Sequence, residues 1–298
     1  GAYNTGLGKD ALAANTTASS NVAIGIAALG ANTTGAENVA TGAFCLEANT
    51  TGAQNTAIGH RALDANTSAN NNTAVGFAAL GANTTGTANT AVGGAAGDAI
   101  TTGGYNTAVG QSSLTALTTG GSNTAVGYAA GQGLTGASNF NVAIGDEVMI
   151  TSGEKSNNTA VGSDAMRLTT TGGDNTAVGH ISLAACTTGS HNTAVGRESG
   201  TAITTGSENT LIGKAAGFSI TTGGLNVIIG RSAGKLTTTA SNITAVGKSA
   251  LQNNTTGSES TAVGTGALES NTTAQNTALG FYAGRLNTTG DGNTALGR

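Results

Sequence analysis

Residues 123–127 read Asn-Thr-Ala-Val-Gly, and this five-residue phrase or a near relative returns every 17 residues along the chain. One step between closing glycines is 18 residues (Gly127 to Gly145) and one is 16 (Gly264 to Gly280). A fixed period of this kind is typical of stacked, identical supersecondary units. We therefore predict one continuous repeat domain over residues 1–298. Its expected fold is an all-β parallel β-roll, or β-solenoid, of about eighteen 17-residue coils.

The composition agrees with a thin, repetitive core. Of 298 residues 49 are glycine, only 9% are charged, 3% are aromatic, and proline is absent. Missing proline fits a chain whose backbone N–H groups are needed in a ladder, and strict phasing of the aliphatic residues argues against disorder. The net charge of −4 gives no reason to expect a nucleic acid partner, and no apolar run is long enough for direct membrane insertion. Because the chain starts and stops inside its repeat, we expect it to be an excerpt of a longer fibre protein.

The two residues before each repeat glycine predict a strand that is apolar on both faces. The residue directly before it is Val, Ile or Leu in 17 of 18 copies, and the residue two before it is alanine in 15. Adjacent strand residues point to opposite faces, so one face lines the coil and the alanine face suits close approach of another copy. Leu211 and Ile228 interrupt the alanine column, and we expect the chains to diverge there. The predicted trimer-facing column includes Ala23, Ala57, Ala91, Ala125, Ala160 and Ala194.

The second half of the coil shows compensating changes. Four residues after the glycine stands Leu or Met in eleven coils and Gly in six. In those six an aliphatic residue appears two or three positions later: Ile100, Leu134, Ile203, Ile220, Leu236 and Leu286. Exchanges that preserve buried volume indicate a packed core. The Asn that opens the phrase predicts a hydrogen-bonded ladder along the stack, and the Thr-Thr pair that follows predicts a second short strand.

The phrase Asn-Thr-Ala-Val-Gly, followed by Ala-Leu or Ala-Gly, resembles the head repeats of YadA-like trimeric autotransporter adhesins. It is also similar to the 17-residue repeats of trimeric phage tail fibres and bacterial surface fibres. The resemblance covers the whole chain and implies a homotrimer, an adhesive role and an extracellular location on a cell surface or virion fibre. The expected function is a stiff shaft or head of a trimeric fibre that contacts a host, prey or other surface.

A basic column follows the repeat glycine over five consecutive coils. It consists of His180, Arg197, Lys214, Arg231 and Lys248. Stacked about 4.8 Å apart, these side chains repel one another. One interpretation is a surface-binding stripe for a glycan or lipopolysaccharide on a target surface; the other is a solvated stripe balanced by Glu198, Glu208 and Glu259.

We expect no enzyme activity, cofactor or metal site in this chain. The three histidines lie in different coils without a phased carboxylate, and Cys45 and Cys186 are expected to be buried small residues. Two alternatives to an adhesive fibre remain: a monomeric Thr-rich β-solenoid that binds ice, and a structural filament that assembles end to end.

Overall fold

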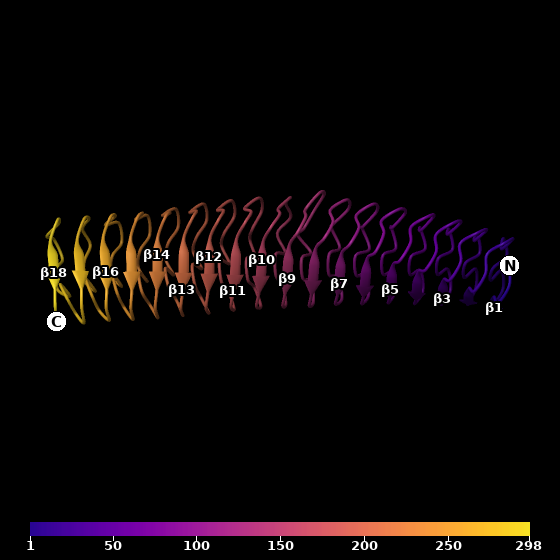
Figure 1. Ribbon diagram of the computed structural model, residues 1–298, viewed down its shortest axis with the longest axis horizontal. Helices are drawn as coiled ribbons and strands as arrows, with labels where there is room; N and C mark the ends of the chain where they lie inside the picture. The colour runs from indigo at the N-terminus through magenta and orange to yellow at the C-terminus, as the bar shows by residue number, and fades with distance from the viewer. The chain divides into compact units, whose positions relative to one another are not determined.

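A computed structural model describes residues 1–298 in two compact units, Gly1–Lys155 and Ser156–Arg298. Each unit is a parallel β-solenoid with one three-residue strand per coil and no helix, which confirms the predicted fold class (Figure 1). That the two units form one continuous domain stays a prediction.

The first unit holds β1 (Thr5–Leu7), β2 (Val22–Ile24), β3 (Val39–Thr41), β4 (Thr56–Ile58), β5 (Thr73–Val75), β6 (Thr90–Val92), β7 (Thr107–Val109), β8 (Thr124–Val126) and β9 (Val142–Ile144). The second holds β10 (Thr159–Val161), β11 (Thr176–Val178), β12 (Thr193–Val195), β13 (Thr210–Ile212), β14 (Val227–Ile229), β15 (Thr244–Val246), β16 (Thr261–Val263), β17 (Thr277–Leu279) and β18 (Thr294–Leu296).

Within each unit every strand pairs in parallel with the strand of the next coil, and equivalent repeat residues are partners. Ala57 of β4 is thus opposite Ala74 of β5, and Ala177 of β11 is opposite Ala194 of β12. The arrows of each unit point the same way and follow one another in chain order (Figure 1). In-register stacking turns each repeat position into a column of side chains.

The alanine column faces the interior of the single coil, and the prediction that it faces a partner chain is wrong. The side chains of Ala23, Ala57, Ala91, Ala125, Ala160 and Ala194 are all 0% exposed in the isolated chain. In each strand the alanine points inward, while the residues before and after it point outward. The larger aliphatic residue next to the glycine is therefore the one on the surface.

The predicted core compensation is confirmed where the new aliphatic residue stands three positions after the glycine that replaces the core leucine, as Ile100 does after Gly97. A Cβ added to Gly97 would lie 3.1 Å from Cδ1 of Ile100, so the isoleucine fills the space that a leucine side chain takes in other coils. Ile100, Leu134, Ile203 and Ile220 are fully buried. Leu236 and Leu286 stand only two positions after Gly234 and Gly284 and are 43% and 79% exposed. The prediction of a buried replacement therefore fails for these two residues.

Leu211 and Ile228 are also fully buried, so they do not separate neighbouring chains as expected. Glycines make room for them. A Cβ on Gly200 or Gly217 would lie 2.7 or 2.8 Å from a terminal methyl of Leu211, and one on Gly234 would lie 2.8 Å from Cδ1 of Ile228. Leu211 therefore shares the space beside Gly200 and Gly217 with Ile203 and Ile220, and Ile228 extends into the space beside Gly234.

The asparagine ladder is confirmed. The N–H of Asn38 donates to Oδ1 of Asn21 at 2.9 Å, and Nδ2 of Asn38 donates to the carbonyl of Gly52 at 2.9 Å. A second buried ladder, which the sequence analysis missed, joins Asn49 Nδ2 to Asn32 Oδ1 at 2.9 Å. These bonds satisfy buried amides and backbone groups from one coil to the next, and so they hold the register.

The Thr-Thr segment does not form the predicted second strand. Its backbone still bonds between coils, for example from Thr33 N to Thr50 O at 3.0 Å. Left-handed residues break up the backbone of each coil: around the second coil they are Ser20, Ala27 and Leu29, with φ between 51° and 60°. The Thr-Thr segment itself is bent: the consecutive N–H groups of Thr33 and Thr34 both donate to the carbonyl of Thr50, which is not the evenly spaced pattern of a parallel ladder.

Both irregular steps are absorbed between strands. The 18-residue step leaves β8 and β9 in register, with Val126 opposite Ile144. The 16-residue step leaves β16 and β17 in register, with Ala262 opposite Ala278. One inserted or deleted residue therefore changes a turn and leaves the stack intact.

The repeat glycine combines a positive φ angle with close contact to the backbone of the next coil. At Gly76 the φ angle is 138°, and an added Cβ would lie 2.4 Å from the carbonyl oxygen of Gly93. We expect Gly76→Ala to lower the free energy of unfolding by at least about 2 kcal/mol, through backbone strain and this contact. Urea or thermal unfolding followed by circular dichroism measures the change. The control is Gly94→Ala, because a Cβ there meets nothing within 4 Å; equal effects of the two changes would contradict this account.

The shared space between the alanine and leucine columns predicts that substitutions in the two columns have coupled effects on stability. Ala57→Leu is expected to destabilise the fold by about 1–3 kcal/mol, because Leu46 and Leu63 occupy the places that Gly200 and Gly217 take around Leu211. Leu63→Gly combined with Ala57→Leu should then cost less than the two single changes together. Unfolding midpoints of the four proteins measure the interaction energy, and simple additivity would show that these columns do not share space.

Candidate functional site

The basic column predicted from the sequence lies on the surface of the second unit. His180, Arg197, Lys214, Arg231 and Lys248 are all exposed, and each follows the glycine that ends a strand from β11 to β15. We call these five residues the basic ladder.

Backbone hydrogen bonds align the basic ladder directly. The N–H of Ser232 donates to the carbonyl of Lys214 at 2.9 Å, and the N–H of Ser249 donates to the carbonyl of Arg231 at 3.0 Å. The N–H of Ala215 likewise donates to the carbonyl of Arg197 at 3.0 Å. Because each cation is joined through backbone to the cation of the next coil, the column keeps the interstrand spacing of about 4.8 Å.

Carboxylates balance only one end of the basic ladder. Arg197 forms an ion pair with Glu198, with Nη2 and Oε1 2.5 Å apart. Lys214, Arg231 and Lys248 have no ion pair, so Glu208 and Glu259 do not balance them as the second interpretation of the column required. Residues Asn209–Ser258 contain four Lys or Arg and no Asp or Glu, in a chain whose net charge is −4. The positive charge is therefore concentrated in these coils.

An apolar column runs beside the ladder along the outer face of the strands. It consists of the residue before each repeat glycine, and we call it the outward aliphatic column. In the first unit it includes Ile24, Ile58, Val92 and Ile144; in the second it includes Val178, Val195, Ile212 and Leu279. These side chains are between 36% and 54% exposed, whereas the alanines beside them are buried. The sequence analysis assigned this column to the interior because both columns are apolar.

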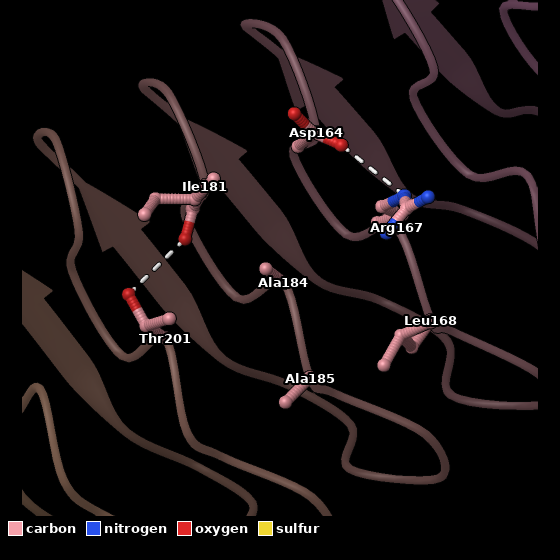
Figure 2. Close-up of a pocket in the computed structure, with 7 residues that line it drawn as sticks. All are labelled: Asp164, Arg167, Leu168, Ile181, Ala184, Ala185 and Thr201. Carbon is pink, nitrogen blue, oxygen red and sulfur yellow. Dashed lines mark hydrogen bonds and ion pairs between the residues drawn. The ribbon is translucent and has the colours of Figure 1, made fainter.

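A shallow pocket of about 310 Å³ lies on the turn side of the second unit (Figure 2). Arg167 Nε pairs with Asp164 Oδ1 at 3.2 Å, and the Thr201 hydroxyl donates to the carbonyl of Ile181 at 3.2 Å. Leu168, Ala184 and Ala185 complete an apolar lining. The polar groups of the pocket thus bond to the protein itself, and the recess has the chemistry of an apolar surface depression.

The first unit carries a short aromatic stack around His60. Its ring lies parallel to Phe77, 5.6 Å between centroids, and edge-on to Phe44 at 5.8 Å. Phe44, Glu47, His60 and Arg61 line a second shallow pocket of about 260 Å³. His191, in the second unit, has Nε2 3.8 Å from Asp174 Oδ2, a carboxylate neighbour that sequence reasoning missed. Asp174 precedes His191 by 17 residues, one repeat period, and this spacing is the sequence signal that indicates the contact.

No group of three or more His, Cys, Asp and Glu side chains comes together in either unit. Cys45 and Cys186 are free and buried, as predicted. Burial raises the pKa of the Cys186 thiol to about 11 and also raises the pKa of Cys45. Thiolate is the reactive form of cysteine, so these two residues belong to the core.

The threonine pairs use one of their two hydroxyls within the fold. Thr33 Oγ1 donates to the carbonyl of Thr50, and Thr50 Oγ1 to the carbonyl of Thr67, both at 3.0 Å. The second threonine of these pairs, Thr34 or Thr51, is exposed. Each pair therefore offers a single column of outward threonines.

Lys155 is the one lysine whose side chain enters the interior. It stands at a corner position that holds Gly35 and Gly52 in other coils, and it is 3% exposed. Its Nζ donates to the carbonyls of Thr151 at 2.7 Å and Gly133 at 3.3 Å. Gly133 belongs to the coil with the 18-residue step, so the buried amine lies beside the irregular turn. Burial lowers the pKa of Lys155 from 10.5 to about 8.

This shift predicts a pH-dependent stability. Between pH 8 and 10.5 the unfolded chain still holds the proton of Lys155 while the folded chain has released it, so folding gains stability as pH rises. Relative to Lys155→Met, the parent should gain up to ~3 kcal/mol across this range and show no change below it. Thermal unfolding at several pH values measures the difference. Lys9→Met, an exposed lysine, supplies the baseline, and a pH-independent difference for Lys155→Met would refute the assignment.

The chain contains no helix of the length and apolar character needed to cross a membrane. Searches of protein-family models, curated proteins and solved structures found nothing that matches this sequence or this fold.

Proposed function

We propose that the chain is a structural and adhesive segment of a trimeric extracellular fibre, on a cell surface or a virion. It serves as a stiff shaft or head that contacts a host, prey or other surface. Three kinds of support carry this proposal: the 17-residue phrase with its resemblance to adhesin and tail-fibre repeats, the solenoid fold of each unit, and the outward aliphatic column.

The outward aliphatic column is the main support for self-association. Partly exposed Val, Ile and Leu residues recur in nearly every coil, on the flat outer face of a parallel sheet. Within each unit a second copy of the chain has the same spacing between coils, so its aliphatic side chains would fit between those of the first. Covering this column removes apolar area from water at about 25 cal/mol per Å². The column thus replaces the alanines as the proposed contact between chains.

Ice binding remains the second candidate function. One outward threonine per pair gives a regular hydroxyl column, although the other hydroxyl of the pair bonds to the backbone. Thermal hysteresis in a solution of the purified protein tests this candidate directly.

The proposal predicts a mass in solution near three times 28.4 kDa, about 85 kDa, by light scattering after size exclusion. Ile212→Asp should reduce this mass, because the side chain is 39% exposed in the single chain and belongs to the outward aliphatic column. Leu225→Asp is the control, since Leu225 is 53% exposed but lies outside that column. A parent mass of 28.4 kDa, or dissociation by both changes alike, would contradict the proposed contact.

A further inference from the structure

We propose that the basic ladder binds a linear anionic polysaccharide whose acidic groups run along the stack, parallel to the column. This inference gives the proposed adhesive role a ligand class and rests on that role. It is carried by the cations that no carboxylate balances, Lys214, Arg231 and Lys248, in three consecutive coils of the second unit.

The first step of the argument is electrostatic. Like charges directly opposite each other on paired strands destabilise a sheet, and here three cations are held in adjacent coils by backbone hydrogen bonds. Glu198 pairs with Arg197, whereas Glu208 and Glu259, the next carboxylates along the chain, form no ion pair with Lys214, Arg231 or Lys248. A polyanion laid along the column removes this repulsion and gains from every coil at once.

The second step is geometric. One cation per coil forms a line with a spacing of about 4.8 Å. The length of one sugar unit in an extended polysaccharide is comparable, so successive acidic sugars or sulfate groups can meet successive cations. Ser232 and Ser249 follow Arg231 and Lys248 directly, and both are partly exposed. Their hydroxyls would bond to sugar hydroxyls beside the charged groups.

The third step separates a polysaccharide from other polyanions. Single-stranded nucleic acids are held by stacking on several aromatic side chains, and the coils from Asn209 to Ser258 contain one aromatic residue, the partly buried Phe218. An anionic membrane is a plane of charge, whereas these cations form a single line. In the first unit the same column holds Lys9 and His60 three coils apart, among residues such as Ile26, Phe77 and Tyr128. Basic residues follow one another in consecutive coils only in the second unit.

The test uses heparin as a sulfated probe and polygalacturonate as a carboxylate probe, titrated into the full chain by calorimetry at several salt concentrations. We expect both to bind the parent and neutral dextran not to bind. Lys214→Gln/Arg231→Gln/Lys248→Gln should weaken binding at least about tenfold and reduce the slope of log Kd against log salt by about two. Lys214→Arg/Lys248→Arg should retain binding, because it keeps the charges.

The matched control is a pair of single changes in one coil. Arg231→Gln and Lys235→Gln remove the same charge, but only Arg231 belongs to the ladder. Arg231→Gln should weaken binding several-fold more than Lys235→Gln. Equal effects of the two, or failure of both glycans to bind at low salt, would overturn the inference. So would ladder-dependent binding of phosphatidylserine vesicles or duplex DNA in the absence of glycan binding.

Light scattering on the same samples keeps the two proposals apart. A trimer that binds neither glycan would overturn the polysaccharide site and leave the fibre proposal standing. A monomer that binds both glycans through the ladder would overturn the fibre proposal and leave the polysaccharide site in place.

Discussion

The close stacking of repeat glycines is the constraint on which the rest of the structure depends. At Gly76 the backbone takes a conformation that L side chains rarely adopt, and it passes so near the carbonyl of Gly93 that no Cβ fits between them. This approach ends each strand at the same point and puts the next residue on the surface. The places of the strand residues and of the basic ladder along each coil follow from it.

The side chains of the alanine and leucine columns share one interior space, and their summed volume limits which residues each column can hold. The inward strand position needs a small residue such as Ala57, because the buried side chains of Leu46 and Leu63 already occupy the interior beside it. Where Leu211 and Ile228 break that rule, glycines supply the missing space. The two asparagine ladders then fix the register, because a shift of one residue would leave buried amides without partners.

The period, the parallel stacking, the main asparagine ladder and the Ile100-type compensation could all be predicted, since each depends only on spacing along the chain. The inward face could not, because alanine and valine are both apolar and alternation alone does not choose between them. Side-chain volume does choose, once the leucine column is placed inside the coil. The predicted Thr-Thr strand failed for a different reason: the segment is bent, so that the N–H groups of Thr33 and Thr34 share the carbonyl of Thr50, and threonine's preference for strands does not reveal this. For the basic ladder, sequence placed the column on the surface, whereas the absence of ion pairs at Lys214, Arg231 and Lys248 required coordinates.

Because the stack accommodates an 18-residue and a 16-residue step, the number of coils can change during evolution. Because an extra or missing residue is confined to one turn and the flanking strands stay in register, a coil behaves as an exchangeable module. Recombination between two copies of the repeat in the gene would add or remove whole modules, and the joined ends would present the same asparagine, alanine and glycine to each other. Unequal crossing-over can therefore vary the number of coils, and with it the number of cations in the ladder, without a new core having to be selected.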